Sequence, residues 1–340
     1  MGRERKDANA APPSRLRYHR SVAPVRTGPF WWTHAAALFA AGSMVGMDLL
    51  RHLSFFVAVA EEGHFGNAAT RLGMTQPPLS QGVRRLEQRL GTELVSRSAR
   101  GVGLTEAGRH LLPRARLLVN DAARFEDEAR RLAGGSDAVV RWGVTPALGD
   151  DVVVRCVRAL RDADRAHRTR VVTRTAATTD LVEEVRSGSL DVAVIEHPAL
   201  LTGLGSGPVL KIRRWVVVPD DHPAATARQP QVRMLRGLTL STGPRSDNPP
   251  AHDLFVDLWR ARGLDPDVVV APGPREVLAH VAAGGCFGVT TTSPTDMPGV
   301  AWLDLVRHDL ALRVRIVWRS GSDVSVSAGA LDRVLFKGGR

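Results

Sequence analysis

The segment from Phe65 to Leu90 constrains this chain most, because it predicts two short helices joined by a tight turn. The first helix ends at Gly73, a residue that easily takes the left-handed conformation found at helix C-termini. Thr75 is a good N-cap for the second helix, and Pro77 and Pro78 fall in its first turn, where missing backbone N–H groups cost little. The sequence therefore predicts a helix-turn-helix.

The second helix of this pair has one apolar face and one polar face. The apolar positions follow each other at steps of four, three and four residues and are Leu79, Val83, Leu86 and Leu90. The polar face carries amide, hydroxyl and guanidinium groups, which suit the base edges and phosphates of the DNA major groove. The candidate DNA-binding residues are Thr75, Gln76, Pro77, Ser80, Gln81, Arg84 and Arg85. The alternative is an ordinary helical hairpin whose arginines are only solvated.

The charge balance of the chain also favours an anionic partner. The formal net charge is +11 and the sequence pI is near 11.1, values that bear on association rather than on fold. The 340 residues suffice for about two or three domains, and a 44% hydrophobic content is enough for packed cores. Cys156 and Cys286 stand far apart and lack metal-ligand spacing. We therefore predict two buried, inert thiols rather than a disulfide scaffold, a redox pair or a zinc site, and we expect no metal and no cofactor.

The first 46 residues differ from the rest of the chain. A basic, proline-containing stretch precedes a mostly apolar run from Phe30 to Met47. A membrane span needs about 20 apolar residues, and this run is interrupted by Thr33, His34, Gly42 and Ser43. A secretory signal has the same basic-then-apolar order, but export does not suit a DNA-binding unit. We predict a disordered or over-extended tail at residues 1–46, with Met47 as the natural initiator.

Three flanking elements extend the helix-turn-helix into a winged domain over residues 47–104. Met47 to Glu62 has the apolar spacing of an amphipathic helix that can pack on the other two. Leu94 to Arg97 and Val102 to Leu104 are short extended segments on either side of a turn, and they predict the two strands of a wing. Arg97 and Arg100 stand where a wing would contact phosphates without reading sequence.

A long helix is predicted over residues 105–133. Its apolar residues alternate steps of four and three through about three heptads, which is the repeat of a coiled-coil seam. We predict that this seam joins two copies of the chain through Leu111, Ala115, Leu118, Ala122, Phe125, Ala129 and Leu132. The alternative is a helix that packs only on its own domain.

With these elements in order, Met47 to about Arg131 resembles the N-terminal region of LysR-type transcriptional regulators. The matching stretches are MDLLRHLSFFVAVAEEGHF, AATRLGMTQPPLSQGVRRLEQRLG and RSARGVGLTEAGRHLL. Two residues depart from the family pattern. Gly82 stands inside the second helix of the motif, where its low helix propensity costs about 1 kcal/mol and where we expect it to leave one DNA contact empty. Val95 replaces the phenylalanine that is usual before the wing.

The resemblance continues from Val139 to about Leu335, over RWGVTP, LVEEVRSGSLDVAVIEHP and WVVVPDDHP. Apolar β-rich runs alternate there with helical stretches, which predicts parallel βαβ units. The expected strands are Val139–Val144, Arg170–Thr175, Leu190–Ile195, Arg214–Val218, Val268–Val270 and Phe287–Thr290. The family implies two lobes with a ligand cleft between them, which we expect at residues 139–212 with 319–336 (lobe 1) and 213–318 (lobe 2).

The predicted fold class is therefore α/β, with an N-terminal all-α winged helix-turn-helix, a long linker helix and a two-lobe effector domain like a periplasmic binding protein. In open α/β sheets, ligands bind at the carboxyl ends of strands, against helix N-termini that favour anions. The candidate effector-binding residues at such positions are Thr145, Pro146, Thr178, Glu196, Thr242, Arg245, Ser246, Arg275 and Thr291. We expect Arg245 and Arg275 to pair with an anionic metabolite. The alternative is that the hydroxyl residues are only helix caps and the arginines only surface residues.

Together these features predict a sequence-specific transcriptional regulator of the LysR type, controlled by a small metabolite. Its expected partners are a double-stranded DNA operator, the effector, further copies of itself in a homodimer or homotetramer, and RNA polymerase if it activates transcription. We expect a cytoplasmic protein without a membrane segment. An enzyme is disfavoured because no P-loop, GxSxG, HExxH or nucleotide-binding glycine motif occurs. A nonspecific DNA-binding protein and a solute-binding protein stay open beside the regulator.

Overall fold

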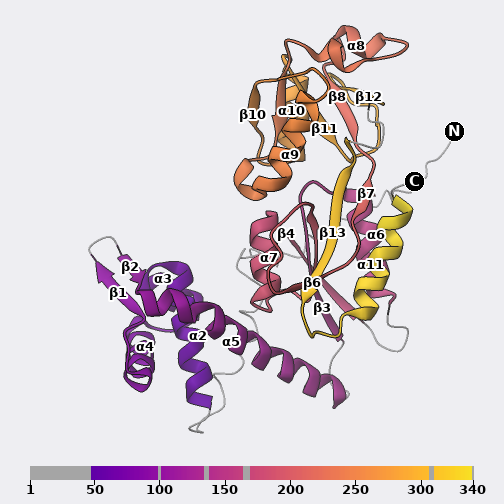
Figure 1. Ribbon diagram of the computed structural model, residues 1–340. Helices are drawn as coiled ribbons and strands as arrows, with labels where there is room; N and C mark the ends of the chain where they lie inside the picture. Colours follow the sequence, from indigo (N-terminus) through magenta and orange to yellow (C-terminus); the bar gives the residue numbers. More distant parts are fainter. Residues whose placement is uncertain (1–46, 99–100, 134–137, 164–168, 306–309, 339–340) are drawn as a thin grey trace, which may run out of the picture.

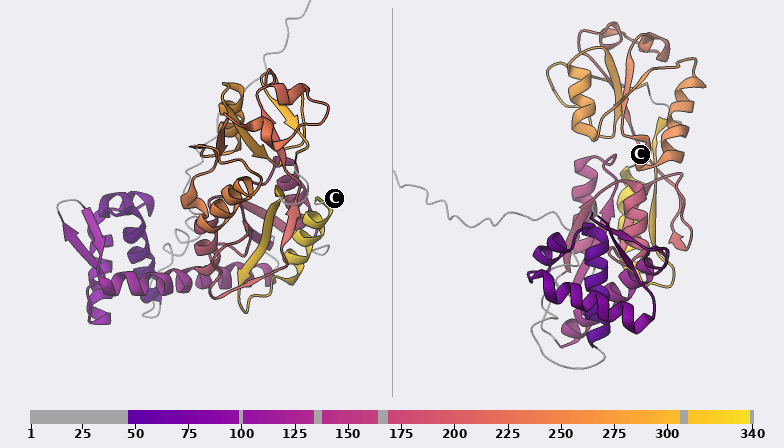
Figure 2. Two further views of the ribbon diagram at one scale, coloured as in Figure 1. Left: turned by 45° about the horizontal axis from the view of Figure 1, so that its top comes forward. Right: turned by 90° about the vertical axis from the view of Figure 1, so that its left-hand side faces the viewer.

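The computed structural model describes residues 47–98, 101–133, 138–163, 169–305 and 310–338. This part of the chain forms a small helical domain, one long helix and a two-lobed α/β unit (Figure 1). Two further views show the long helix running from the helical domain to the nearer lobe (Figure 2). The predicted N-terminal tail lies outside the described residues. Within the described ranges, no helix combines the length and the apolar character needed to cross a bilayer.

The helical domain contains the predicted helix-turn-helix and wing. The first described helix packs on both helices of the motif, and their common core includes the fully buried Phe56, Leu79 and Leu86. Gly73 (φ 67°) and Gly91 (φ 68°) take the left-handed conformation just after the two motif helices. The elements are α2 (Met47–Glu62), α3 (Phe65–Arg71), α4 (Gln76–Leu90), β1 (Val95–Ser98) and β2 (Gly101–Leu104).

The wing is an antiparallel hairpin anchored to the end of α4. The Glu87 carboxylate accepts the backbone N–H groups of Leu94 at 2.9 Å and Val95 at 3.1 Å. Val95, which replaces the usual phenylalanine, is itself buried in the helical core. The hairpin therefore starts from a defined position relative to α4.

Gly82 lies on the buried side of α4, so the expectation that it leaves a DNA contact empty is wrong. A Cβ at this position would lie 2.4 Å from Cδ2 of Phe55 and 3.0 Å from Cδ2 of His52. Both residues belong to α2, so the absent side chain allows α2 and α4 to approach each other closely. This packing offsets the cost of glycine inside a helix.

Helix α5 (Glu106–Leu132) begins in the helical domain and then leaves it. The Thr105 hydroxyl caps the helix by accepting the N–H of Gly108 at 2.9 Å. Gly108 touches the chain that precedes β1, where a Cβ would lie 2.0 Å from the carbonyl oxygen of Leu94. The buried α5 residues that join the helical core are Leu112, Ala115 and Val119.

Lobe 1 is a six-stranded sheet in the order β4-β3-β5-β13-β6, with β7 also paired to β13. Strand β3 is parallel to β4 and β5, whereas β13 is antiparallel to β5. Helices α6 and α11 cover one face and α7 covers the other, with a separate apolar cluster under each (Figure 1). The elements are β3 (Ala138–Val144), α6 (Asp150–Arg161), β4 (Thr169–Thr175), α7 (Thr178–Arg186), β5 (Val192–Glu196), β6 (Leu204–Ser206), β7 (Leu210–Ile212), β13 (Leu312–Arg319) and α11 (Ser325–Gly338).

Lobe 2 is a five-stranded sheet in the order β10-β9-β11-β8-β12. Strand β9 is parallel to both neighbours, and β8 is antiparallel to β11 and β12. Trp259 packs edge-on against Phe287 in its core, with ring centroids 5.2 Å apart. The elements are β8 (Trp215–Val218), α8 (Pro223–Thr226), η2 (Val232–Leu235), β9 (Thr239–Thr242), η3 (Arg245–Asp247), α9 (Pro249–Arg260), β10 (Val268–Val270), α10 (Pro274–Ala282), β11 (Cys286–Thr290) and β12 (Ala301–Leu303).

The chain passes from lobe 1 to lobe 2 between β7 and β8 and returns between β12 and β13. The expected return at residue 319 is wrong, because β13 pairs with β5 from Val314 opposite Glu196 to Trp318 opposite Val192. The alternating run Leu312–Arg319 is compatible with either sheet, and only its pairing places it in lobe 1. The six strands expected from the sequence all occur, with ends displaced by about one or two residues.

Candidate functional site

The polar face of α4 is exposed, opposite the buried stripe. Ser80 lies half-buried at its edge. Four side chains that we expected to reach DNA are exposed and make no hydrogen bond or ion pair with other described residues: Gln76, Gln81, Arg84 and Arg85. On α3, by contrast, Arg71 is neutralised by ion pairs with Glu61 and Glu62. Helix α4 therefore keeps amide and guanidinium groups available for a ligand. Leu90, expected at the end of the buried stripe, is 44% exposed.

The turn before α4 and the wing flank this polar face. Thr75 occupies the N-cap of α4 with an extended backbone, but its hydroxyl makes no capping hydrogen bond. Both Thr75 and Pro77 are exposed. Arg97 lies opposite Val102 in the wing hairpin. The side chain of Arg97 and all of Arg100 lie outside the described residues, so their phosphate contacts stay predictions.

The predicted seam of α5 divides into a packed part and an open part. Leu111 and Ala115 pack on the helical domain, and Ala115 is only 4% exposed. The assignment of Ala115 to an interface between chains is therefore wrong, because its own core already covers it. The remainder of the stripe is accessible in one chain, with Leu118 52%, Phe125 73% and Leu132 75% exposed, Ala129 exposed and Ala122 half-buried. Large apolar groups left exposed in this way indicate a contact with another protein surface.

A different side of α5 docks on lobe 1 through polar contacts. Arg124 donates to the carbonyl oxygen of Gly188 at 2.8 Å and pairs with Asp191 at 2.8 Å. The Asn120 amide donates to the carbonyl oxygen of Ser187 at 2.7 Å. Two further ion pairs extend this contact and are Arg319–Asp121 and Arg141–Asp127. The turn between α7 and β5 is thus held against the linker helix.

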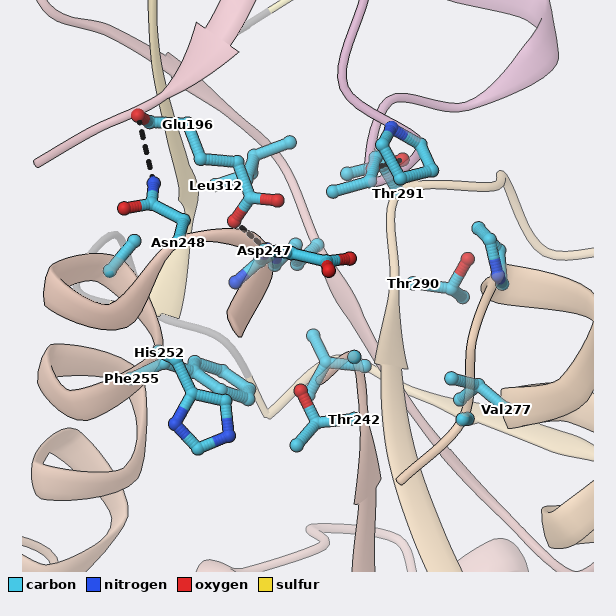
Figure 3. Close-up of a pocket in the computed structure, with 18 of the residues that line it drawn as sticks. Glu196, Thr242, Asp247, Asn248, His252, Phe255, Val277, Thr290, Thr291 and Leu312 are labelled. Carbon is cyan, nitrogen blue, oxygen red and sulfur yellow. Dashed lines mark hydrogen bonds and ion pairs between the residues drawn. The ribbon is translucent and has the colours of Figure 1, made fainter. Parts of the chain in front are cut away.

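A cleft lies between the lobes, at the carboxyl ends of β3 and β5 in lobe 1 and of β9 and β11 in lobe 2. Figure 3 shows residues that line it. Among the residues expected to bind an effector, those that line it are Pro146, Glu196, Thr242 and Thr291. The lining residues that Figure 3 labels in addition are Asp247, Asn248, His252, Phe255, Val277, Thr290 and Leu312. Their arrangement combines carboxylate, amide, imidazole and hydroxyl groups with an apolar wall.

Two hydrogen bonds join the lobes across the cleft. The Thr291 hydroxyl on lobe 2 donates to the carbonyl oxygen of Ala147 on lobe 1 at 2.8 Å. The Asn248 amide donates to the carbonyl oxygen of Glu196 at 3.2 Å (Figure 3). Asn248 occupies the N-cap position of α9, but its side chain makes no capping hydrogen bond and instead crosses to the other lobe. Opening the cleft would break both contacts.

Glu196 is the most extensively held polar residue of the cleft. Its carboxylate accepts the Thr145 hydroxyl at 2.9 Å, and its backbone N–H donates to the Thr178 hydroxyl at 3.3 Å. Both threonines are buried. They position Glu196 instead of lining the cleft themselves, which differs from the direct contact expected of them.

Charged groups of both signs surround Glu196. Arg214, at the start of lobe 2, lies 3.9 Å from its carboxylate and stacks over the ring of Phe255. Burial lowers the pKa of Arg214, and the charge of Glu196 opposes that shift. Burial, together with the charges of Asp180 and Glu196, raises the pKa of Asp247. An occupant of the cleft would therefore meet both a guanidinium and a carboxyl group.

Besides the two buried threonines, three more of the expected effector contacts lie outside the cleft lining. Arg245 is exposed and makes two hydrogen bonds with the carboxylate of Asp253, at 2.6 and 2.7 Å. Ser246 and Arg275 are exposed and do not line the cleft. Strand-end positions predict which loops meet, but they do not predict which side of a loop a residue faces. Arg214, which does line the cleft, has no local signal in the sequence that marks it.

Comparison with known proteins identifies both parts of this arrangement. The model of the bacterial regulatory helix-turn-helix protein, LysR family, matches residues 50–109, and the model of the LysR substrate binding domain matches residues 133–335. The chain belongs to the LysR family. Its helix-turn-helix domain, linker helix and two-lobed domain are thus those of a LysR-type transcriptional regulator.

Individual relatives align with most of this LysR-type chain. ShiR, an HTH-type transcriptional regulator of Corynebacterium glutamicum (strain R), is 33% identical over 302 residues, which cover 84% of this chain and 98% of ShiR. A probable hydrogen peroxide-inducible genes activator of Mycobacterium avium is 36% identical over 283 residues, which cover 79% and 88% of the two chains. The crystal structure of the LysR family regulator CbnR superposes with a TM-score of 0.63 at 21% identity, covering 86% of this chain and 99% of CbnR. CbnR complexed with its target DNA gives a TM-score of 0.62, also at 21% identity, and covers 85% of this chain and 99% of that one.

The two cysteines of this LysR-type regulator lie away from the cleft lining. Cys156 is fully buried in the core of lobe 1, and this burial raises the pKa of its thiol to about 12. Cys286 is half-buried at the start of β11. Reactive thiols need an accessible, electropositive environment, which Cys156 lacks.

Proposed function

We propose that this regulator acts in the cytoplasm, where it binds a two-half-site DNA operator as a homodimer or a tetramer of such dimers. A small molecule in the interlobe cleft controls that binding. The domain at residues 47–104 reads DNA, residues 105–133 pair the chains, and the two lobes sense the ligand. RNA polymerase is a further partner if the protein activates transcription.

The polar face of α4 supports operator binding. Its exposed amides and guanidinium groups suit base edges, and the whole face is carried by one rigid helix whose other side is buried. The exposed stripe of α5 supports pairing of two such helix-turn-helix domains. A symmetric dimer presents two recognition helices to half-sites about one helical turn apart or a multiple of it.

The observation that carries control by a ligand is the position of α7 between the cleft and the linker helix. Its first turn supports Glu196 through Thr178 and contacts η3 of lobe 2. The turn after α7 holds Asn120 and Arg124 of α5. A ligand that changes the distance between the lobes would therefore displace an element that α5 is bonded to.

The cleft favours a small effector with polar and apolar parts. Phe255, Leu258 and Val277 offer it an apolar wall. The anionic group expected of the effector would have Arg214 as its partner, in place of Arg245 and Arg275. Because neither cysteine lines the cleft, reversible ligand binding is favoured over oxidation of a cleft thiol, although one relative bears the name of a peroxide-inducible activator.

Footprinting of the full-length protein on the DNA upstream of its own gene tests the operator half of the proposal. We expect protection of two half-sites that persists in excess nonspecific DNA and is lost in Arg84→Ala. Arg89→Ala, which removes an exposed arginine from the last turn of the same helix, is the matched control and should retain the footprint. Absence of protection above competitor DNA would refute specific operator binding.

A thermal-shift screen of small metabolites tests the effector half. A ligand of the cleft should raise the melting temperature of the wild type and change its footprint. The double variant Asn248→Ala, Thr291→Val removes both hydrogen bonds between the lobes. It should keep the footprint but lose the change caused by the ligand. If the ligand acts equally on this variant, the cleft is not its site.

A further inference from the structure

Strand β13 carries two arginines on the same face of the lobe 1 sheet. Arg313 lies directly opposite Lys211 of β7, and its carbonyl oxygen accepts the N–H of His197 at 2.8 Å on the other side. Directly opposite residues in neighbouring strands project to the same face. Arg315, two residues along β13, projects there as well. We call His197, Lys211, Arg313 and Arg315 the β13 basic row.

The basic row is on the face covered by α7, not on the face of the main lobe 1 core. Leu312, Val314 and Ile316, which alternate with the two arginines, are buried in the cluster under α6 and α11. Val317 shares the face of the arginines and is buried in the cluster under α7. This face is less covered near the hinge, by which we mean the two segments that connect the lobes. There Lys211 is exposed, and Arg313, Arg315 and His197 are half-buried.

No described acidic group neutralises the row. None of its four side chains makes a hydrogen bond or an ion pair with another described residue. The nearby Glu196 projects to the opposite face, where Thr145 and Arg214 hold it. Asp304, at the lobe 2 side of the hinge, is already paired with Arg213 at 2.6 Å.

Two side-chain nitrogens of the row are buried and have no hydrogen-bond partner among the described residues. They are Nε of Arg315 and Nδ1 of His197. A buried polar atom of this kind is rare and calls for a partner such as water or an ion. The charges of Arg315 and Arg313, added to burial, lower the pKa of His197, which shows that the positive potential of the row reaches the imidazole. The site therefore lacks a negatively charged acceptor.

We propose that the β13 basic row binds a small, multiply charged oxyanion, such as a phosphate group or a pair of carboxylates on one molecule. Guanidinium groups bind such oxygens through paired, charge-assisted hydrogen bonds. Two residues apart on a strand, the arginines are separated by about 7 Å, which one anion with several oxygens can bridge. The partly recessed arginines favour a small anion over a nucleic acid backbone or an acidic protein.

This site goes beyond the proposed function, although His197 and Arg313 also border the interlobe cleft. Strands β7 and β13 continue directly into the two segments that connect the lobes. An anion on the row would relieve the repulsion among its cations and stabilise lobe 1 beside the hinge. It would do so without occupying the Glu196 side of the cleft.

Isothermal titration calorimetry of the full-length protein with potassium phosphate tests the proposal, with chloride at matched ionic strength as the blank. We expect saturable binding with one site per chain, and a dissociation constant raised about tenfold or more in Arg315→Gln and in Arg313→Gln. A parallel titration with citrate tells whether phosphate or carboxylate groups bind more tightly. Arg228→Gln, which removes an exposed arginine from lobe 2, should bind phosphate like the wild type.

A variant of the cleft separates the two sites. Thr291→Val should bind phosphate normally, and the footprint on operator DNA should persist in Arg315→Gln. The proposal is overturned if phosphate binding is not saturable, or if Arg315→Gln leaves it unchanged. It is also overturned if Thr291→Val abolishes phosphate binding while Arg315→Gln does not, because the anion would then occupy the cleft. Loss of nonspecific duplex binding in Arg315→Gln without saturable phosphate binding would instead assign the row to nucleic acid.

Discussion

The polar face of α4 and the interlobe cleft are assembled in opposite ways. On α4, the side chains that we propose to face DNA come from one short stretch, Gln76–Arg85, and they need no partner in the rest of the described chain. The cleft takes its lining from both lobes and from the segments between them, and its central Glu196 depends on contacts from Thr145, Arg214 and Asn248. A site carried by one helix moves as a rigid unit, whereas a site shared by two lobes can open and close.

The largest effect is expected at the exposed stripe of α5, through which we propose that two copies of the chain pair. Replacing Phe125 and Leu132 by glutamate places charges in the exposed stripe of α5 that a dimer would bury. Burying an unpaired charge should weaken dimerisation by about 3 kcal/mol or more. Analytical ultracentrifugation should show dissociation, and the footprint should shrink or disappear. As controls, Glu128→Gln and Arg130→Gln, which change the charge at exposed positions beside the stripe, should leave the dimer intact.

The next effect concerns the packing that supports the α4 face. Gly82→Ala brings a methyl group against Phe55 and should lower the free energy of unfolding by about 1–3 kcal/mol through overpacking. Denaturant unfolding measures this loss. Phe55→Leu in the same chain should recover part of it, because a smaller side chain makes room. A Gly82→Ala protein as stable as the wild type would contradict the close approach of α2 and α4.

The α4 face itself is tested by single side chains. Gln81→Ala or Arg84→Ala should cost about 1–3 kcal/mol of operator binding and relax base preference if these residues contact base edges. Fluorescence anisotropy with operator and mutated operator duplexes measures both quantities. Arg89→Ala is the control with the same charge change. Unchanged base preference in Gln81→Ala would show that another part of the helix reads the sequence.

The cleft should respond less strongly to a single change. Asn248→Ala removes one neutral hydrogen bond between the lobes, a change worth about 0.5–1.5 kcal/mol. We expect little loss of overall stability but a more open cleft, which small-angle X-ray scattering of the full-length protein would detect. Operator binding without ligand should be close to that of the wild type. An equal loss of operator binding and of ligand response would mean that the two sites are not separable.

The smallest expected effect is a pH dependence at Asp247. Its folded pKa is raised above the ordinary value, so this carboxyl favours the folded state while protonated. That contribution is complete below the ordinary pKa and is lost as the pH rises through the raised folded pKa. Asp247→Asn should therefore raise the melting temperature at neutral pH and flatten its dependence across that acidic window. Differential scanning calorimetry measures the change in a pH series that starts at about pH 4, near the ordinary pKa of a carboxyl group, and continues to neutral pH.

The polar face of α4 and the interlobe cleft also differ in how far the amino-acid sequence predicted them. The apolar steps of α4 and its turn residues are local, and they predicted the buried stripe at Leu79, Val83 and Leu86. The cleft brings Arg214 and Asn248 of lobe 2 to Glu196 of lobe 1, from positions far apart in the sequence, so the local pattern could not assign them to it. Even on α4, the direction of Gly82 was missed, because a glycine gives no apolar or polar signal to the helical pattern.

By itself, the amino-acid sequence determined the order of elements, the winged helix-turn-helix, the stripe of α5 and the family to which the chain belongs. These features rest on short-range periodicity and turn chemistry, which act within a few residues. Only the tertiary structure decided that Gly82 meets Phe55, that Ala115 is covered by its own domain, and that β13 belongs to lobe 1. It also decided that Arg214 reaches the cleft and that Arg313 and Lys211 share one face of the lobe 1 sheet. Packing between distant segments settles such questions, because it chooses among faces and partners that the local pattern leaves equivalent.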